Sequence, residues 1–243
     1  MLEGTDAVLS VLVAPSCAAC GSLLDHPTAG PVCAGCWSSI LPLTAPLCDR
    51  CGDPLPSWRV ISRPLALCPR CRRAASDVTR ARAIGAYDGR LRSIVHALKY
   101  EGRRSLARPL AALMRLRGAD ILAGATCAVP VPLHRSRRRA RGFNQAADLA
   151  RHLGLPLVFA LRRSRETAAQ TGLPAAQRHR NVRGAFTLSR AGRRLSRHAA
   201  VVVLVDDVST TGATLAACAR TLKDAGIPEV RALTAARVVA PPR

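Results

Sequence analysis

The sequence predicts an α/β protein with a mainly parallel sheet flanked by helices and a small cysteine-rich region near the N-terminus. Unbroken apolar runs such as residues 202–205 are typical of strands buried on both faces of a parallel sheet. Segments with helical spacing of apolar residues alternate with these runs. Eight of the ten cysteines fall within 55 residues, from Cys17 to Cys71.

The length and composition suit a globular protein of one ordinary domain, alone or with a small appendage. Of the 243 residues, 49% are hydrophobic, which is enough for a substantial core. No apolar run approaches the ~18 residues of a membrane span. The first residues include Glu3 and Asp6 and no basic run, so we expect no secretory signal peptide and a cytoplasmic location.

The charge is strongly basic. The formal net charge is +22, from 37 basic and 15 acidic residues, and the only two lysines are Lys99 and Lys223. Such an excess suits phosphate-rich partners, either nucleic acid or a phosphorylated substrate. A GC-rich genome produces the same arginine-rich composition, so charge alone leaves contact with nucleic acid open. Aromatic residues make up only 3%, which disfavours a base-stacking platform.

Four Cys-x-x-Cys pairs mark the N-terminal region as a predicted double zinc ribbon over residues 15–73. Each pair presents two thiolates on one tight turn, and two pairs complete a tetrahedral zinc site. The simplest pairing is sequential, although alternate pairs would also use all eight cysteines. Disulfides and an iron–sulfur cluster are the other chemistries open to them, and the missing export signal disfavours disulfides. The predicted ligands of two structural zinc ions are Cys17, Cys20, Cys33 and Cys36, then Cys48, Cys51, Cys68 and Cys71.

A polar, basic linker is expected at residues 72–83, and a second domain at residues 82–243. Its strands and helices are predicted from apolar periodicity, and Gly102 is a plausible helix stop. The expected strands are residues 84–87, 128–131, 156–161, 202–205 and 230–239. The expected helices are residues 91–98, 103–117, 146–153 and 215–224, with an exposed connection or hairpin at 187–199.

Residues 202–214 carry the most specific chemical signal. A buried strand is followed by two carboxylates, a turn of small residues and a helix. Backbone N–H groups, hydroxyls and the positive end of a helix dipole at one point suit a phosphate monoester. The carboxylates can accept hydrogen bonds from vicinal hydroxyls or lie near Mg²⁺, so the pair of features describes a ribose 5-phosphate. A plain strand end with a Thr/Gly turn is the structural alternative. The residues concerned are Asp206, Asp207, Ser209, Thr210, Thr211, Gly212, Ala213 and Thr214.

Two further basic stretches add to this site. Pro132, Leu133, His134 and Arg135 form a proline-shaped loop that leads into a run of arginines, a combination that can hold a pyrophosphate or can be a solvated basic turn. Residues 162–186 are polar and lack periodicity, which is typical of a lid or a disordered loop. The polar residues singled out there are Arg165, Thr167, Gln170, Arg178 and Asn181.

Residues 206–214 resemble the phosphoribosyl pyrophosphate (PRPP) motif of type I phosphoribosyltransferases. Together with the cysteine pairs and further ordered motifs, they make nearly the whole chain resemble the ComF family. The further motifs are Leu98-Lys99-Tyr100 with Gly102, Pro130-Val131-Pro132-Leu133, Arg141-Gly142-Phe143-Asn144-Gln145, and the block from Arg165 to Phe186.

The resemblance implies a type I phosphoribosyltransferase fold after the zinc ribbon. It implies that Asp206 and Asp207 are the catalytic pair that holds the ribose hydroxyls, and that residues 209–214 hold the 5′-phosphate. Residues 132–135 would be the pyrophosphate loop, and the block from Arg165 to Asn181 a flexible hood over PRPP. Glutamine amidotransferase activity, found in one relative of this fold, is not expected.

Two functions follow from the resemblance. In the first, the protein binds PRPP with Mg²⁺ and transfers the phosphoribosyl group to an acceptor that the sequence does not identify. In the second, it is a non-catalytic or PRPP-sensing factor in DNA uptake that contacts single-stranded DNA and a helicase-like ATPase. An intact phosphate motif favours retained PRPP binding in both cases.

Overall fold

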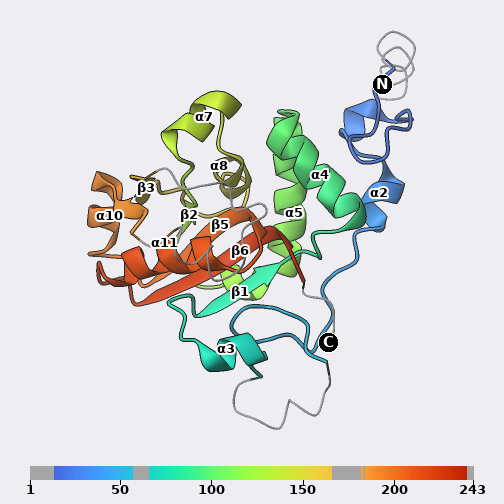
Figure 1. Ribbon diagram of the computed structural model, residues 1–243. Coiled ribbons are helices and arrows are strands. Elements are labelled where there is room, and N and C mark those ends of the chain that lie inside the picture. The colour runs from blue at the N-terminus through green and yellow to red at the C-terminus, as the bar shows by residue number, and fades with distance from the viewer. Residues whose placement is uncertain (1–13, 57–65, 166–181, 183, 240–243) are drawn as a thin grey trace.

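The protein is described from a computed structural model that covers residues 14–56, 66–165, 182 and 184–239. Its centre is a four-stranded parallel sheet with the strand order β1-β6-β5-β2 (Figure 1). The strands are β1 (Arg80–Ala83), β2 (Cys127–Pro130), β5 (Val201–Ser209) and β6 (Glu229–Arg237). This is the predicted α/β fold with a mainly parallel sheet.

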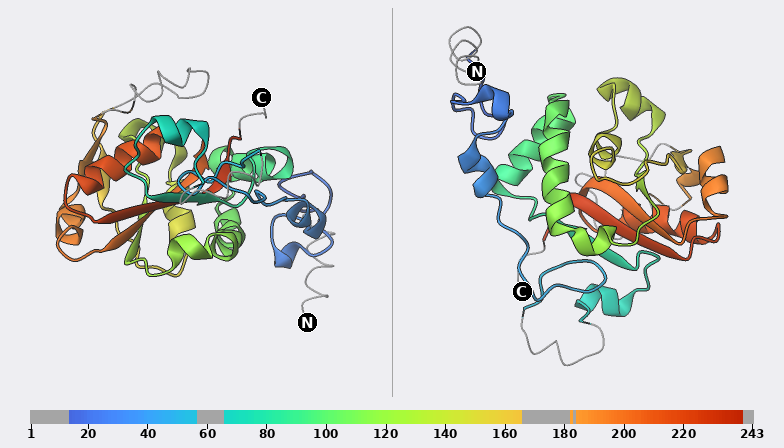
Figure 2. Two further views of the ribbon diagram at one scale, coloured as in Figure 1. Left: turned by 90° about the horizontal axis from the view of Figure 1, so that it is seen from below. Right: turned by 180° about the vertical axis from the view of Figure 1, so that it is seen from behind.

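Helices cover both faces of the sheet (Figure 2). One face packs against α4 (Gly89–Tyr100), α5 (Ala107–Arg117) and α8 (Gln145–Ala150). The other face packs against α11 (Ala213–Lys223) and a small antiparallel pair, β3 (Leu161–Arg163) and β4 (Phe186–Leu188). The shorter elements are η1 (Pro27–Ala29), α2 (Ala34–Ser38), α3 (Pro69–Arg73), η3 (Arg104–Leu106), α6 (Ala119–Leu122), α7 (Arg135–Arg141) and α10 (Arg190–Leu195).

The central strand β5 contributes side chains to both hydrophobic cores. Val203 and Val205 belong to the core under α4 and α8, whereas Val202 and Leu204 belong to the core under α11. Successive side chains of a strand point to opposite faces, which explains this division. The strand is longer than predicted, because its pairing with β6 continues to Ser209. Both predicted aspartates therefore lie within the strand.

The expected linker ends in a strand instead. Residues 80–83 form β1, and the strand expected at 84–87 is reduced to one isolated bridge at Ala86. The alternation Arg80-Ala81-Arg82-Ala83 has the period of a strand, and β1 is an edge strand with one buried side chain, Ala81. Its long arginines carry the polar face, so composition alone suggests a linker.

Three other segments also differ from expectation. Residues 156–161 add only one bridge to the outer edge of β2, at Leu157, before the chain turns into β3. The expected exposed connection at 187–199 holds most of β4 and the whole of α10. The basic run after His134 is the short helix α7, which His134 caps and which has no buried residue. A solvated helix of arginines gives no apolar periodicity from which to predict it.

The two cysteine-rich ribbons dock at different places (Figure 2). The first ribbon, residues 14–40, packs against α4, where Arg90 donates a hydrogen bond of 3.1 Å to the Ala19 carbonyl. The second ribbon, residues 46–56 and 66–73, lies against β1, where the Ala81 N–H donates a bond of 2.7 Å to the Arg50 carbonyl. Among the described residues, no helix is long and apolar enough to cross a membrane.

Candidate functional site

The loop between β5 and α11 has the geometry of a phosphate site. Gly212 precedes the first residue of α11 and has φ of +77°, a left-handed conformation that favours glycine. The Ala213 N–H donates a bond of 3.3 Å to the Thr211 hydroxyl. The position that a Cβ would take on Gly212 has no described atom within 4 Å. The loop thus offers N–H groups, hydroxyls and open space at the positive end of an eleven-residue helix.

Asp206 and Asp207 lie directly before this loop, on opposite faces of β5. Asp207 is buried and forms an ion pair of 2.7 Å with the amine of Lys99 at the end of α4. Asp206 faces the α11 side, where burial and the charge of Asp206 raise the pKa of Cys218 well above its ordinary value. The Asp206 carboxylate also accepts a 2.9 Å bond from the Asp207 N–H. The two acids therefore have different environments.

The charges of this site shift one another's pKa values. Burial and the negative charge of Asp207 together raise the pKa of Asp206 well above its ordinary value. Burial lowers the pKa of Lys99. The negative charges of Asp207 and Asp206 outweigh this effect, so the Lys99 pKa is raised overall. Lys99 is therefore a fixed cation beneath the acids.

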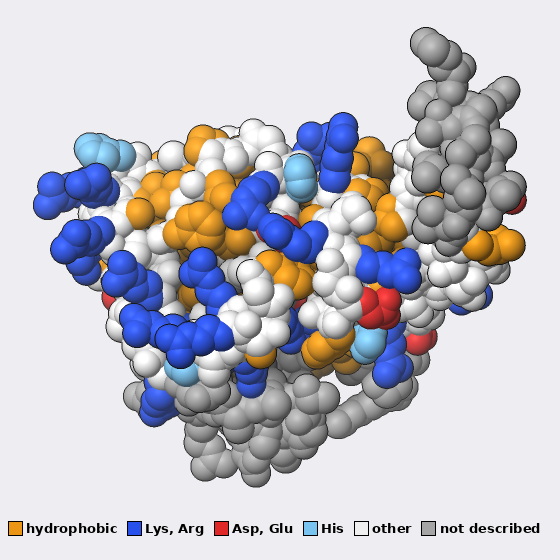
Figure 3. Space-filling view, turned by 90° about the horizontal axis from the view of Figure 1, so that it is seen from above, with side chains coloured by type: hydrophobic (Ala, Val, Ile, Leu, Met, Phe, Trp, Pro, Cys, Tyr) orange, Lys and Arg blue, Asp and Glu red, His pale blue; other side chains and the backbone are white. Residues whose placement is uncertain are grey.

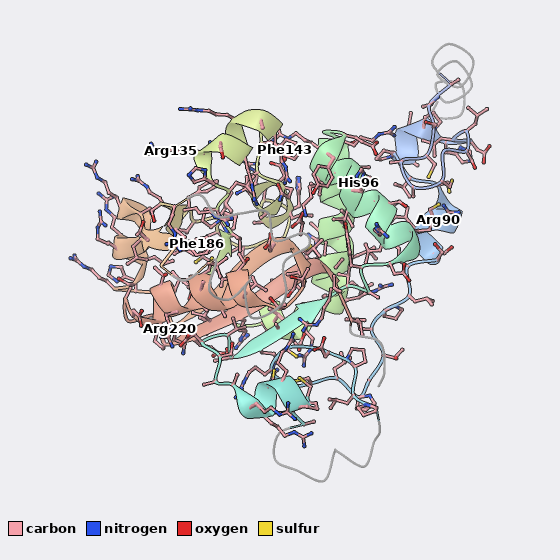
Figure 4. All side chains as sticks on the ribbon, in the orientation of Figure 1. Arg90, His96, Arg135, Phe143, Phe186 and Arg220 are labelled. Atoms are coloured by element: carbon pink, nitrogen blue, oxygen red, sulfur yellow. The ribbon has the colours of Figure 1, made fainter. Side chains whose placement is uncertain are left out.

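The predicted pyrophosphate loop lies beside them, because β2 is the neighbour of β5. The Val131 N–H donates a 2.9 Å bond to the Val205 carbonyl, so the loop after β2 begins beside Asp206 at the carboxyl end of β5. Asn144 holds the loop from the other side with a 3.1 Å bond to the Val131 carbonyl. Arg135 follows as the first, exposed residue of α7 (Figure 4). Ligands of open parallel sheets bind at this carboxyl edge.

Three of the quoted motifs meet at this edge. Tyr100, beside Lys99, is 59% exposed, and its ring lies 5.0 Å from the Arg141 guanidinium. Arg141 in turn donates a 3.1 Å bond to Gln145. Lys99 belongs to one of the quoted motifs, but no role in the site was expected of it. The available signal was its rarity, since it is one of only two lysines in the chain.

The eight cysteines form two groups of four in sequential order. Within each group, all sulfur atoms lie within 4.8 Å of one another. Neighbouring sulfurs are 3.9 Å apart between Cys20 and Cys33, and 3.6 Å apart between Cys51 and Cys68. Thiolates about 2.3 Å from a tetrahedral zinc ion are about 3.8 Å from one another. The structure therefore has the sequential pairing, and both groups fit structural zinc.

Comparison with known proteins agrees with both regions. Residues 8–72 match the family described as "Double zinc ribbon domain", and residues 139–241 match "Phosphoribosyl transferase domain". The chain is 30% identical over 222 residues to "Competence protein F" of Haemophilus influenzae, covering 87% of this chain and 93% of that protein. The chain belongs to the ComF family.

Other relatives of this ComF-family protein carry a different name. "DNA utilization protein YhgH" of Salmonella typhimurium is 34% identical over 189 residues, covering 72% of this chain and 77% of that protein. The protein of the same name from Escherichia coli K12 is 33% identical over 186 residues, with the same coverage.

Most of the predicted hood lies outside the residues that the structure describes. Arg165 is described and is exposed just after β3. Thr167, Gln170, Arg178 and Asn181 fall outside the described residues. The two cysteines beyond the zinc groups, Cys127 and Cys218, are buried, and burial raises the pKa of Cys127 to about 11. Cys127 and Cys218 of this ComF-family protein are therefore unreactive core residues.

Proposed function

We propose that the C-terminal domain of this ComF-family protein binds PRPP with Mg²⁺ and transfers its phosphoribosyl group to an acceptor. The convergence of the loop after β5, the loop after β2 and the Lys99-supported acids at one edge of the sheet supports this proposal. We place this domain at residues 82–243 and the double zinc ribbon at residues 15–73. The eight grouped cysteines are proposed to hold two structural zinc ions.

Each part of the site matches one part of PRPP. Residues 209–214 would bind the 5′-phosphate through N–H groups and hydroxyls. Asp206 and Asp207 would accept hydrogen bonds from the ribose hydroxyls, with Lys99 holding Asp207 in place. Residues 132–135, followed by the arginines of α7, would bind the pyrophosphate. Carboxylate and phosphate oxygens are the ligands that Mg²⁺ prefers, and the ion would neutralise the departing pyrophosphate.

The reaction needs no nucleophile from the protein. The bond between ribose C1 and the pyrophosphate oxygen breaks, the bonding electrons leave with pyrophosphate, and a lone pair of the acceptor forms the new bond to C1. The protein's task is to hold both reactants and to stabilise the leaving group. The predicted hood residues would exclude water from the oxocarbenium-like transition state.

Calorimetric titration of PRPP with Mg²⁺ tests the site, with pyrophosphate release followed in the same samples. The zinc-loaded wild type is expected to bind PRPP, and the double variant Asp206→Asn/Asp207→Asn is expected to lose binding. Asp25→Asn is the matched control, since Asp25 is an exposed aspartate of the first ribbon. A folded wild type that does not bind PRPP would refute the proposal.

A second candidate function is contact with single-stranded DNA, alongside the helicase-like ATPase partner expected from the resemblance. The basic side chains spread over the face above the sheet favour it (Figure 3), as does the exposed Tyr100 flanked by Arg141 and by His96, whose ring centroid is 4.8 Å away. The names of the relatives agree with such a role. Binding to phosphates should weaken steeply with salt, so a salt slope near zero would exclude it.

A further inference from the structure

A large cavity lies outside the catalytic edge. Its volume is about 820 Å³, and its walls come from the second ribbon, β4 and α11. Ligand cavities usually measure about 300–1,000 Å³, so a small organic molecule would fit. Phe186 of β4 and Arg220 of α11, both labelled in Figure 4, are among the lining residues.

The wall of the cavity is largely apolar. Alanines of α11, including Ala213, Ala216 and Ala217, form one side, and Phe186 and Leu188 extend it. The opposite side belongs to the second ribbon. A flat or compact apolar body can lie against small side chains of this kind without displacing them, because alanine leaves room beside the helix.

Arginines outnumber aspartates on the polar part of the cavity. Four arginines and two aspartates line it, together with Cys51 and Cys71 of the second cysteine group. Three of the arginines have protein partners: Arg220 pairs with Asp77 at 3.1 Å, Arg70 pairs with Asp53 at 3.0 Å, and Arg50 donates a 2.7 Å bond to the Cys71 carbonyl.

The fourth arginine, Arg237, is incompletely satisfied. It is only 3% exposed, its Nε contacts Asp53, and its Nη1 donates a long bond of 3.4 Å to the Ser209 hydroxyl. Its Nη2 is buried and has no hydrogen-bond partner among the described residues. A buried, charged donor without a partner is unfavourable, so an acceptor from a ligand that reaches Nη2 would stabilise the folded protein.

The cavity borders the phosphate loop without reaching the acids. Ser209, Thr211 and Gly212 are lining residues, whereas Asp206, Asp207, Lys99 and His134 are not. An acceptor bound here would not meet ribose C1 between the acids and the pyrophosphate loop. The cavity therefore excludes the acids and the pyrophosphate loop, but its wall includes part of the loop proposed to hold the 5′-phosphate.

We propose that this cavity binds a small organic anion with an apolar body. The body would lie against the alanines of α11, and a carboxylate or phosphate would accept a hydrogen bond from Arg237 Nη2. The site does not depend on the proposed binding of PRPP. Because Ser209 contacts Arg237 and also begins the phosphate loop, a ligand in the cavity would contact that loop.

The test is a fluorescence titration of the full-length, zinc-loaded protein with 8-anilinonaphthalene-1-sulfonate, an anion with an apolar body. We expect saturable binding with one molecule per chain. Ala216→Trp fills the cavity and should weaken binding at least tenfold. Arg237→Lys removes the free N–H group and should also weaken it. Ala112→Trp, an exposed alanine of α5 that does not line the cavity, should bind as the wild type does.

Benzoate and phenyl phosphate, added as competitors, distinguish a carboxylate site from a phosphate site by which of them displaces the dye. Wild-type affinity in a folded Ala216→Trp protein, or binding that does not saturate, would overturn the inference. PRPP binding should survive in Ala216→Trp. If this variant loses both PRPP binding and dye binding, the cavity is part of the PRPP site, and the inference of a separate ligand site is overturned. A wild type that binds dye but not PRPP would refute the proposed function alone.

Discussion

At the scale of single residues, the ion pair between Lys99 and Asp207 is the contact on which the arrangement of the site most depends. A buried carboxylate is costly unless it is paired and hydrogen-bonded. Asp207 receives its 2.7 Å partner from α4, more than 100 residues earlier in the chain, and Lys99 is itself only 17% exposed. The lysine is therefore best understood as a positioning residue for the acid that precedes the phosphate loop.

Replacing Lys99 should destabilise the fold as well as the site. Lys99→Met leaves a buried carboxylate without its partner, so we expect the free energy of unfolding to fall by about 3 kcal/mol and PRPP binding to weaken. Urea denaturation at pH 7.5 measures the first effect. The only other lysine, Lys223, bonds the Pro228 carbonyl at an exposed position, and Lys223→Met should cost less than about 1 kcal/mol. Equal losses in the two variants would contradict this role of Lys99.

Replacing Asp206 should stabilise the fold, whereas replacing Lys99 should destabilise it. Its pKa is raised in the folded protein, so the folded state holds the proton more strongly than the unfolded state does. Stability is then lost as the pH rises from about 4, the ordinary pKa of aspartate, through the raised pKa. Asp206→Asn cannot ionise, and we expect it to unfold about 2–4 °C higher than the wild type at pH 8.

Thermal unfolding across pH 4 to 8 checks the sign of this shift. Near pH 4, the unfolded state has ionised only about half of this carboxyl, so the two proteins should unfold at similar temperatures. An Asp206→Asn protein that is less stable than the wild type at pH 8 would show that the ionised Asp206 carboxylate does not destabilise the folded protein. The expected gain in stability with loss of ligand binding is common at functional sites.

The residues that the sequence could identify are those with local signals. The two acids, Gly212 and the cysteine pairs occur in short patterns whose chemistry is recognisable from spacing. Lys99 and Arg237 are not recognisable in this way, because their partners, Asp207 and Asp53, lie far away in the sequence. Only the order of the strands brings these pairs together.

At the scale of elements, the second ribbon is attached to the sheet by a close backbone approach. A Cβ on Gly52 would lie 2.7 Å from the Ala81 carbonyl oxygen, and Gly52 has φ of +72°. Gly21 occupies the equivalent position in the first ribbon, with φ of +77° and no described atom within 4 Å of its Cβ position. Both glycines have the left-handed backbone conformation, but only Gly52 has another backbone atom close to its Cβ position.

Gly52→Ala should therefore cost more than Gly21→Ala. The left-handed backbone costs about 1–2 kcal/mol in both variants. In Gly52→Ala the clash with β1 adds to this, and we expect the total loss to reach about 3 kcal/mol with partial release of the ribbon. Denaturant unfolding gives the energies, and amide hydrogen exchange of Ala81, which donates to Arg50, reports the release. Equal costs for the two variants would show that the contact does not hold the ribbon.

Element prediction succeeded where burial imposes a pattern. The strands β2 and β6 and the helices α4, α5 and α11 were predicted close to their observed bounds, whereas β5 continues four residues beyond its expected end at residue 205. The misassigned elements are those at an edge or in solvent, where arginines replace apolar residues. β1 and α7 are the clearest cases, since most of their side chains are polar. A one-sided or fully solvated element leaves little hydrophobic signal.

At the scale of the whole molecule, the chain is two metal ribbons docked on one α/β body. We expect about two zinc ions per chain by elemental analysis, because each ribbon holds one group of four cysteines. Cys17→Ser and Cys48→Ser should each lose about one ion. Cys127→Ser, in the buried strand β2, should keep both. A Cys17→Ser protein that retains two ions would contradict the assignment of Cys17 as a zinc ligand.

The strand order has a consequence for how the chain is made. β6 is synthesised after the other three strands, yet it lies between β1 and β5. Until β6 leaves the ribosome, β1 has no strand to pair with, and β5 presents an unpaired apolar edge. Unpaired edges readily bind strands of other chains. A growing chain of this protein is therefore most exposed to misassembly late in translation, when a chaperone would help it most.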